Sequence, residues 1–233
     1  MTHPSLRRHL PLTKLTLCAA LLGTTTLAAS AGTTVAPPSN ATVSSAPATA
    51  SADVQMLVRS AVRAGDNKGL PFAVVDKKNA RLFVYRADGT LSGTTPVLLG
   101  AARGDDSVPG IGERPMAQIK PSERTTPAGR FVSEPGRNMQ GEDIVWVDYD
   151  AAVSMHRVRT SNKSERRAQR LASPTIADNR ISYGCINVPA AFYDAHVKPA
   201  LGNTHGVIYV LPETQPMARR FSFPGSPGGA SAD

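Results

Sequence analysis

The sequence predicts a mainly β fold, either a β-sandwich or a mixed sheet, with peripheral helices. From Pro71 onward, short apolar runs alternate with turn residues, as in strands joined by tight connections. The chain holds 19 Gly and 19 Pro in 233 residues, which disfavours long helices. Asp88 and Gly89 lie between two of the apolar runs, and this dipeptide is typical of a β-hairpin turn.

Each element follows from local pattern. The segments expected to form strands are 72–75, 81–86, 91–99, 129–133, 144–149, 152–156 and 207–211. Residues 53–64 should form a short helix with one apolar face, capped by Ser51 or Asp53. A second helix should begin near Pro189 and end near Pro199. Because turns separate the strands, the sheet should be antiparallel or mixed rather than a series of βαβ units.

The N-terminus has the pattern of a secretory signal. Arg7, Arg8 and Lys14 supply positive charge, residues 15–29 are apolar or small, and Ala29-Ser30-Ala31 fits a cleavage site. We therefore expect export to the periplasm or cell envelope. An uncut membrane anchor is the alternative, but the apolar run is short for a span. After cleavage, we expect no integral membrane span.

Composition divides the rest of the chain into three parts. Residues 32–68 are expected to comprise a low-complexity linker, rich in Ala, Thr, Ser and Pro, and then the short helix at 53–64. Residues 69–213 carry the strand pattern and should be the folded domain. Residues 214–233 are rich in Pro, Ser and Gly, which predicts a flexible tail.

Signal cleavage would leave Cys185 as the single cysteine and lower the net charge from +8 to +5. Exported proteins usually pair their cysteines, so a lone thiol indicates either a nucleophile or an inert buried residue. Gly184 permits close backbone approach, and Pro189 should start a helix whose dipole would favour the thiolate. This context favours the nucleophile.

A thiolate nucleophile needs a base, and the mature chain offers His156, His196 and His205. His156 ends a predicted strand, where scaffolds commonly present catalytic groups. His196 falls within the predicted helix and His205 within a turn, so both are expected at the surface. The sequence has no metal cluster, phosphate loop or dinucleotide fingerprint, and we expect no metal and no cofactor.

Four segments in this order resemble the L,D-transpeptidase catalytic domain family (YkuD-like). They are Val75-Asp76 with Leu82, Val84 and Tyr85; Thr126-Pro127-Ala128-Gly129-Arg130-Phe131; His156; and Ser182-x-Gly184-Cys185-Ile186-Asn187. The resemblance covers residues 69–213 and implies an L,D-transpeptidase-like catalytic domain. Two positions differ: Tyr183 stands where the family usually has histidine, and Arg157 follows His156 where the family usually has Gly or another small residue.

The resemblance implies transfer of an acyl group from a peptidoglycan stem peptide through a Cys185 thioester. His156 would act as base, Ser182 would orient its imidazole, and the N–H groups of Gly184 and Cys185 would form the oxyanion hole. It also implies substrate contacts for three residues, Tyr183, Asn187 and Arg157. The acyl acceptor stays open: another stem, an envelope protein, a free D-amino acid or water.

The gap between His156 and Cys185 is longer than is usual in the family. Residues 157–180 carry seven Lys or Arg against two acids, a charge of +5. This basic segment is either a solvated insertion or a lid that attracts acidic substrate.

Three other functions remain to be weighed. A non-catalytic envelope-binding domain would explain Tyr183 as a sign of lost activity. A generic cysteine peptidase lacks support, since the papain-like signature is absent. Nucleic-acid binding has only the basic segment in its favour and is opposed by export, so we expect no nucleic-acid partner.

Overall fold

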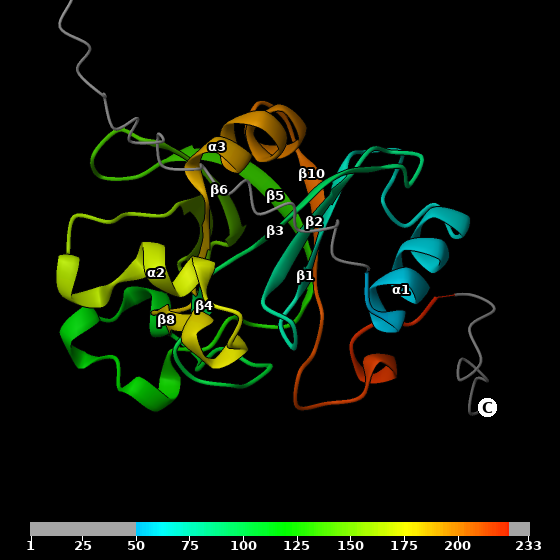
Figure 1. The fold of residues 1–233 in the computed structure, drawn as a ribbon. Coiled ribbons are helices and arrows are strands. Elements are labelled where there is room, and N and C mark those ends of the chain that lie inside the picture. Colours follow the sequence, from blue (N-terminus) through cyan, green and yellow to red (C-terminus); the bar gives the residue numbers. More distant parts are fainter. Residues whose placement is uncertain (1–49, 224–233) are drawn as a thin grey trace, which may run out of the picture. The chain divides into compact units, whose positions relative to one another are not determined.

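The computed structural model describes residues 50–223. The predicted signal at 1–31, most of the predicted linker and the last ten residues, 224–233, lie outside the described residues (Figure 1).

Eight strands form one mixed sheet in the order β3-β2-β1-β10-β5-β6-β7-β9 (Figure 1). In that order their bounds are Leu91–Pro96, Arg81–Tyr85, Phe72–Asp76, Gly206–Val210, Gly129–Arg137, Asp143–Asp148, Val153–Arg157 and Ile186–Val188. The pairs β1–β10 and β7–β9 are parallel, and the other pairs are antiparallel. Strands β4 (Leu99–Gly100) and β8 (Arg180–Ser182) form a separate two-stranded sheet. The predicted fold class, mainly β with a mixed sheet, is confirmed.

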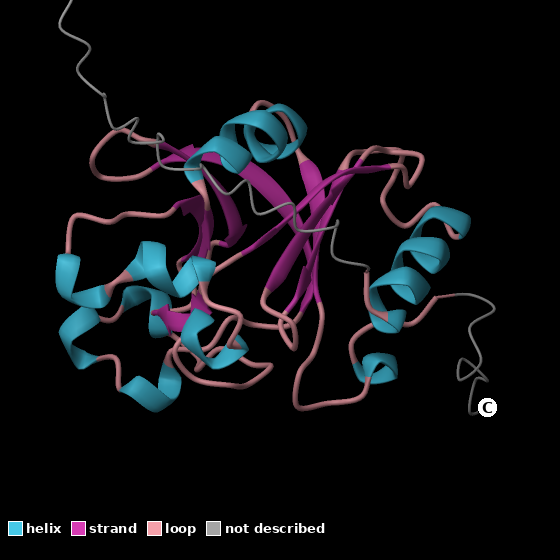
Figure 2. Cartoon of the chain, viewed as in Figure 1, coloured by secondary structure: helices cyan, strands magenta, loops and turns pink. Residues whose placement is uncertain are grey.

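Helices lie at the periphery of these strands, as predicted (Figure 2). They are α1 (Ala52–Arg63), α2 (Arg167–Ala172), α3 (Ala190–Phe192) and the π-helical η6 (Tyr193–Gly202). Short 3-10 turns are η1 (Ile111–Glu113), η2 (Met116–Gln118), η3 (Pro121–Glu123), η4 (Lys163–Glu165), η5 (Ile176–Asn179) and η7 (Met217–Arg219). Within residues 50–223, no helix has the length and apolar character needed to cross a bilayer.

Strand alternation divides the core into two layers. In β1, Ala73 and Val75 face the helical segment η6, whereas Phe72 and Val74 face α1. Strands β2 and β10 alternate in the same way, so these three strands are buried on both faces. Ser51, one of the two residues predicted to cap this helix, caps α1 by accepting a hydrogen bond from the Val54 N–H.

Residues 214–223 differ from the flexible tail expected for residues 214–233. The side chain of Phe221 is 8% exposed and packs with the α1 layer. Thr214 and Gln215 donate their backbone N–H groups to the Asp105 carboxylate, each at 2.8 Å. A buried carboxylate that needs donors thus holds a segment whose composition alone predicts disorder.

Two further elements differ from the expectation. The predicted strand 91–99 is interrupted after Pro96, and Leu98 instead pairs with Asn187 in β9. The residue after Cys185 begins strand β9, and the helix starts only at Ala190. The expectation that a helix dipole acts directly on the thiol is therefore wrong.

Candidate active site

Two parallel strands present four polar side chains on one face of the sheet. His156 in β7 is the register partner of Asn187 in β9, and Met155 is the partner of Ile186. Because side chains alternate along a strand, Ser154 and Cys185 lie one step further along the same face. Met155 and Ile186 point the other way, into the core. The thiol and imidazole predicted as nucleophile and base are therefore neighbours.

The hydrogen bonds of His156 define which nitrogen is free to act. Its Nδ1 lies 2.8 Å from the Arg157 carbonyl oxygen, which can only accept, so Nδ1 carries the proton in the neutral ring. The lone pair is therefore on Nε2, which lies 3.5 Å from Nδ2 of Asn187. This tautomer leaves Nε2 as the atom that can take a proton from a thiol.

The environment of Cys185 lowers the pKa of its thiol. Burial acts to raise this pKa, but hydrogen bonding to the His156 side chain, the charge of that imidazole and contacts with Ser154 outweigh burial. Ser154 Oγ lies 3.6 Å from Cys185 Sγ. The thiol is free and partly accessible, so it combines the reactivity and the access that a nucleophile needs.

Ala152 contributes the other contact of the sulfur. Its carbonyl oxygen lies 3.8 Å from Cys185 Sγ. Its φ of 53° is in the left-handed region, which costs a non-glycine residue about 1 kcal/mol. A strained residue therefore touches the candidate nucleophile, as is common at functional sites.

The Ser182 hydroxyl forms its hydrogen bonds within the cysteine turn and none to the His156 imidazole in the part of the chain that the structure describes, contrary to the role expected for it. Its hydroxyl donates to the Cys185 carbonyl at 2.6 Å and accepts from the Gly184 N–H at 3.1 Å. Ser182 therefore closes the turn that carries the cysteine. The Gly184 N–H is occupied by this bond, so of the two N–H groups expected to form an oxyanion hole, one already has a partner within the turn.

Gly184 is required by backbone geometry. Its φ is 135°, and a Cβ at this position would lie 2.7 Å from the Thr125 carbonyl oxygen. On the same side, Thr126 Oγ1 donates to the Gly184 carbonyl at 2.8 Å. The Thr126-Pro127 motif therefore acts as a support for the cysteine turn.

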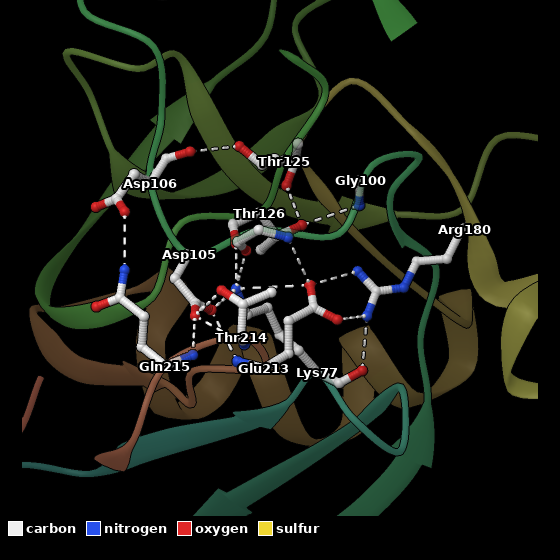
Figure 3. A network of polar contacts seen from close by, with 12 residues as sticks. Lys77, Gly100, Asp105, Asp106, Thr125, Thr126, Arg180, Glu213, Thr214 and Gln215 are labelled. Atoms are coloured by element: carbon white, nitrogen blue, oxygen red, sulfur yellow. Dashed lines mark hydrogen bonds and ion pairs between the residues drawn. The ribbon is translucent and has the colours of Figure 1, made fainter. Parts of the chain in front are cut away.

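A buried charge network lies behind that support (Figure 3). Lys77 Nζ donates to the Thr126 carbonyl and to the Asp105 carboxylate, both at 2.8 Å. Arg180, which begins the strand leading to Ser182, pairs with Glu213 at 2.5 Å and donates to the Lys77 carbonyl at 2.8 Å. No local pattern predicts these pairings, because the partners are distant in the chain.

A pocket of about 280 Å³ opens over the cysteine. Its lining comes from the cysteine turn, from His156, from β9, from η2 and from the basic segment 157–180: Met116, His156, Arg159, Ser161, Asn162, Glu165, Arg167, Ser182, Tyr183, Cys185 and Asn187. The basic segment thus forms one wall of the site. Of its seven basic residues, Arg159 and Arg167 line the pocket.

Arg167 connects the basic segment to the motif. Its guanidinium donates to Asn187 Oδ1 and pairs with Glu165 at 2.5 Å. Asn187, which is 1% exposed, also donates to the Cys185 carbonyl at 3.3 Å. Arg167 was not among the predicted site residues, and no local motif marks it.

Of the residues expected to contact substrate, Tyr183 lines the pocket and Arg157 does not. Tyr183 lines the pocket, with the Arg124 guanidinium 3.9 Å from its ring centroid. Arg157 does not line it: alternation along β7 turns the side chain away from His156, toward Asp143 and Asp194. Arg157 therefore forms ion pairs on the opposite face of the sheet and does not contribute to the site.

The other two histidines lie apart from Cys185. His196 Nδ1 contacts Ser92 Oγ at 3.0 Å, and its ring stacks on Phe192. His205 Nδ1 lies 3.0 Å from the Ser133 carbonyl oxygen. Neither lines the pocket.

Comparison with known proteins gives no match to a family model and no match to a curated protein. Several solved structures are similar. The catalytic domain of an E. faecium L,D-transpeptidase is 18% identical over 60% of this chain and 96% of its own, with a TM-score of 0.32. A Mycobacterium smegmatis L,D-transpeptidase is 18% identical over 60% of this chain and 58% of its own, with a TM-score of 0.33.

A third similar structure is the helical cell shape determining protein Pgp2 of Campylobacter jejuni. It is 13% identical over 63% of this chain, with a TM-score of 0.40, and the match spans 48% of its own length. The solved structures that are similar to this chain thus include the catalytic domain of one L,D-transpeptidase and the structure of a second L,D-transpeptidase.

Proposed function

We propose that the protein is a cysteine acyltransferase that acts on peptidoglycan stem peptides. The observation that carries the proposal is the array of Ser154, His156, Cys185 and Asn187 on one sheet face, with the thiol pKa lowered by His156. The stem-peptide substrate is supported by the motif resemblance across residues 69–213.

In the first half-reaction, Cys185 attacks the carbonyl that follows an L-centre and precedes a D-residue. A C–S bond forms, the C–N bond to the D-residue breaks, and His156 Nε2 delivers the thiol proton to the leaving amine. The Cys185 N–H stabilises the oxyanion, since the Gly184 N–H already donates to Ser182.

In the second half-reaction, an amine attacks the thioester carbonyl. A C–N bond forms, the C–S bond breaks, and the amine proton passes to His156. Water in place of the amine gives L,D-carboxypeptidase activity at the same site. Stem peptides carry carboxylates, and Arg167 and Arg159 in the pocket wall supply matching charge.

We place this activity in the periplasm or cell envelope, because residues 1–31 have the pattern of a signal peptide. Residues 69–213 would form the catalytic domain. Mass measurement of the protein purified from the envelope tests this placement: loss of the first 31 residues is expected, and a full-length cytoplasmic protein would contradict it.

Incubation with disaccharide-tetrapeptide, followed by mass spectrometry of the products, tests the function. The parent protein should release the terminal D-residue and form a crosslinked or hydrolysed product, and Cys185→Ala should form neither. Binding of the fragment without any product would favour the alternative, a non-catalytic envelope-binding domain with Tyr183 at a retired position.

A further inference from the structure

A second cleft lies close to the candidate nucleophile through Ala152. Its volume is about 470 Å³, and its lining includes Trp146, Tyr149, Asp150, Glu113 and Ala152. We call it the aromatic cleft. It shares no lining residue with the pocket over Cys185.

Two contacts connect the aromatic cleft to the sulfur. Ala152 lines the cleft, and its carbonyl oxygen lies 3.8 Å from Cys185 Sγ. Trp146 is the register partner of Ser154, whose Oγ lies 3.6 Å from the same sulfur. Register partners in a sheet share a face and are about 5 Å apart. The indole therefore stands on the catalytic face, one strand beyond Ser154.

The two aromatic rings form a platform rather than part of the core. Trp146 and Tyr149 meet edge to face, with centroids 5.1 Å apart. Tyr149 is 72% exposed. A Cβ at Gly136 would lie 2.5 Å from the indole nitrogen, so glycine at that position makes room for the ring on the neighbouring strand. Trp146 is partly buried and Tyr149 is exposed, and the faces of such accessible aromatic rings attract cations.

The pocket over Cys185 and the aromatic cleft differ in the charge of the residues that line them. The pocket over Cys185 contains Arg159 and Arg167 with one carboxylate, Glu165. The aromatic cleft contains two carboxylates, Glu113 and Asp150, and no basic residue. Across the part of the chain that the structure describes, neither Glu113 nor Asp150 forms an ion pair.

We infer that the aromatic cleft binds the acyl acceptor, and that this acceptor is a cationic amine without a carboxylate beside its nitrogen. This inference rests on the proposed acyltransferase function and extends it. The ammonium docks against Trp146, Tyr149 and Asp150 and loses one proton to solvent. The neutral nitrogen then attacks the Cys185 thioester: the C–N bond forms, the C–S bond breaks, and the second proton passes to His156. The products are the amide and the Cys185 thiolate beside an imidazolium.

The test measures how the acyl-enzyme divides between aminolysis and hydrolysis. Tetrapeptide serves as donor and D-alaninamide as acceptor, and the products are quantified by mass spectrometry. Tyr149→Ala and Asp150→Asn, both at exposed positions, should each lower the aminolysis-to-hydrolysis ratio by about two- to fivefold, as expected for exposed cation contacts. The rate of acylation by the donor should not change.

Two controls test whether the effect is specific to the aromatic cleft and to the acceptor without a carboxylate. Asp88→Asn removes an exposed carboxylate in the β2–β3 turn, outside the cleft, and should leave the ratio unchanged. D-alanine carries a carboxylate beside the same amine, so the variants should affect its ratio less than that of D-alaninamide.

An unchanged ratio in both variants would overturn the inference. Slower acylation in the variants would also overturn it, because the cleft would then serve the donor. If the parent protein forms no acyl-enzyme at all, the proposed function fails instead, so the two failures are distinguishable.

Discussion

Ser154 Oγ lies 3.6 Å from Cys185 Sγ because Cys185 directly precedes β9 and Ser154 directly precedes Met155, the β7 residue that pairs with Ile186 at the start of β9. The contact lowers the pKa of the thiol together with His156. Ser154→Ala should therefore raise the Cys185 pKa and slow acylation by about three- to tenfold, the effect of one lost hydrogen bond. Ultraviolet absorbance of the thiolate against pH measures the shift. Ser161→Ala, in the same pocket but not among the contacts of the sulfur, should titrate like the parent.

Removal of the His156 imidazole should shift the pH dependence of thiolate formation. Since His156 lowers the Cys185 pKa, His156→Ala should raise it, and thiolate should appear only at higher pH. Turnover at neutral pH should fall by at least about a hundredfold, because the base is also lost. His196→Ala and His205→Ala should retain parental rates. Dependence on His196 instead of His156 would contradict the assignment of the base.

Gly184→Ala should disrupt the cysteine turn, because the added Cβ would lie 2.7 Å from the Thr125 carbonyl oxygen. A shift of the turn by about 1 Å is expected to lower kcat by roughly a hundredfold. Gly141→Ala is the matched control: Gly141 also has a positive φ, of 79°, but nothing lies within 4 Å of its Cβ position. Gly141→Ala should retain parental activity, and a Gly184→Ala variant with the same activity would contradict the role assigned to the contact with Thr125.

Asp105→Asn should destabilise the fold in a pH-dependent manner. Burial acts to raise the pKa of Asp105, but the hydrogen bond from Lys77 and those from residues 213–214 outweigh it and lower the pKa below its usual range. The stabilisation is therefore present above the unfolded-state pKa of about 4 and is lost as the pH falls through the folded-state value.

At pH 7, the variant should lose about 3 kcal/mol of unfolding free energy, as when one partner of a buried ion pair is removed. Urea denaturation at several pH values measures this loss, which should shrink below pH 4. Asp106→Asn is the control, since the Asp106 side chain is 66% exposed. A constant loss at all pH values would contradict the electrostatic explanation.

Arg167→Gln separates a substrate-binding role of the basic segment from that of a solvated insertion. The Arg167 guanidinium lines the pocket, so its loss should raise KM for a stem peptide with free carboxylates by about three- to tenfold at low salt. An amidated substrate should be affected less. Arg166→Gln removes an exposed charge that does not line this pocket and should behave like the parent. A fall in kcat at constant KM would instead indicate that Arg167 positions Asn187.

Periodicity in the sequence predicts most of the sheet. The strands around Val74, Phe83, Val145 and Ile208 are apolar and bounded by turn residues, and all were expected near their observed positions. Strands β8 and β9 have three residues each, too few for a pattern. Their pairing depends on long-range partners, such as Leu98 for Asn187, which local sequence does not reveal.

The candidate site could be predicted in part, where a motif or strand alternation marks a residue. The motif predicts Cys185 and His156, and strand alternation from His156 would also have identified Ser154 and excluded Arg157. The bond of Ser182 to its own turn follows from backbone geometry, which sequence does not specify. Arg167 reaches the pocket through the fold of the basic segment.

Intact-protein mass spectrometry after brief mixing with disaccharide-tetrapeptide shows whether Cys185 forms a covalent acyl intermediate. A transient adduct is expected on the parent protein, equal in mass to the donor without its terminal D-residue. The adduct should be located on Cys185 by peptide mapping, be released by hydroxylamine as a thioester is, and be absent from Cys185→Ala. An adduct that persists in Cys185→Ala, or product formation by that variant, would contradict the claim that Cys185 is the nucleophile.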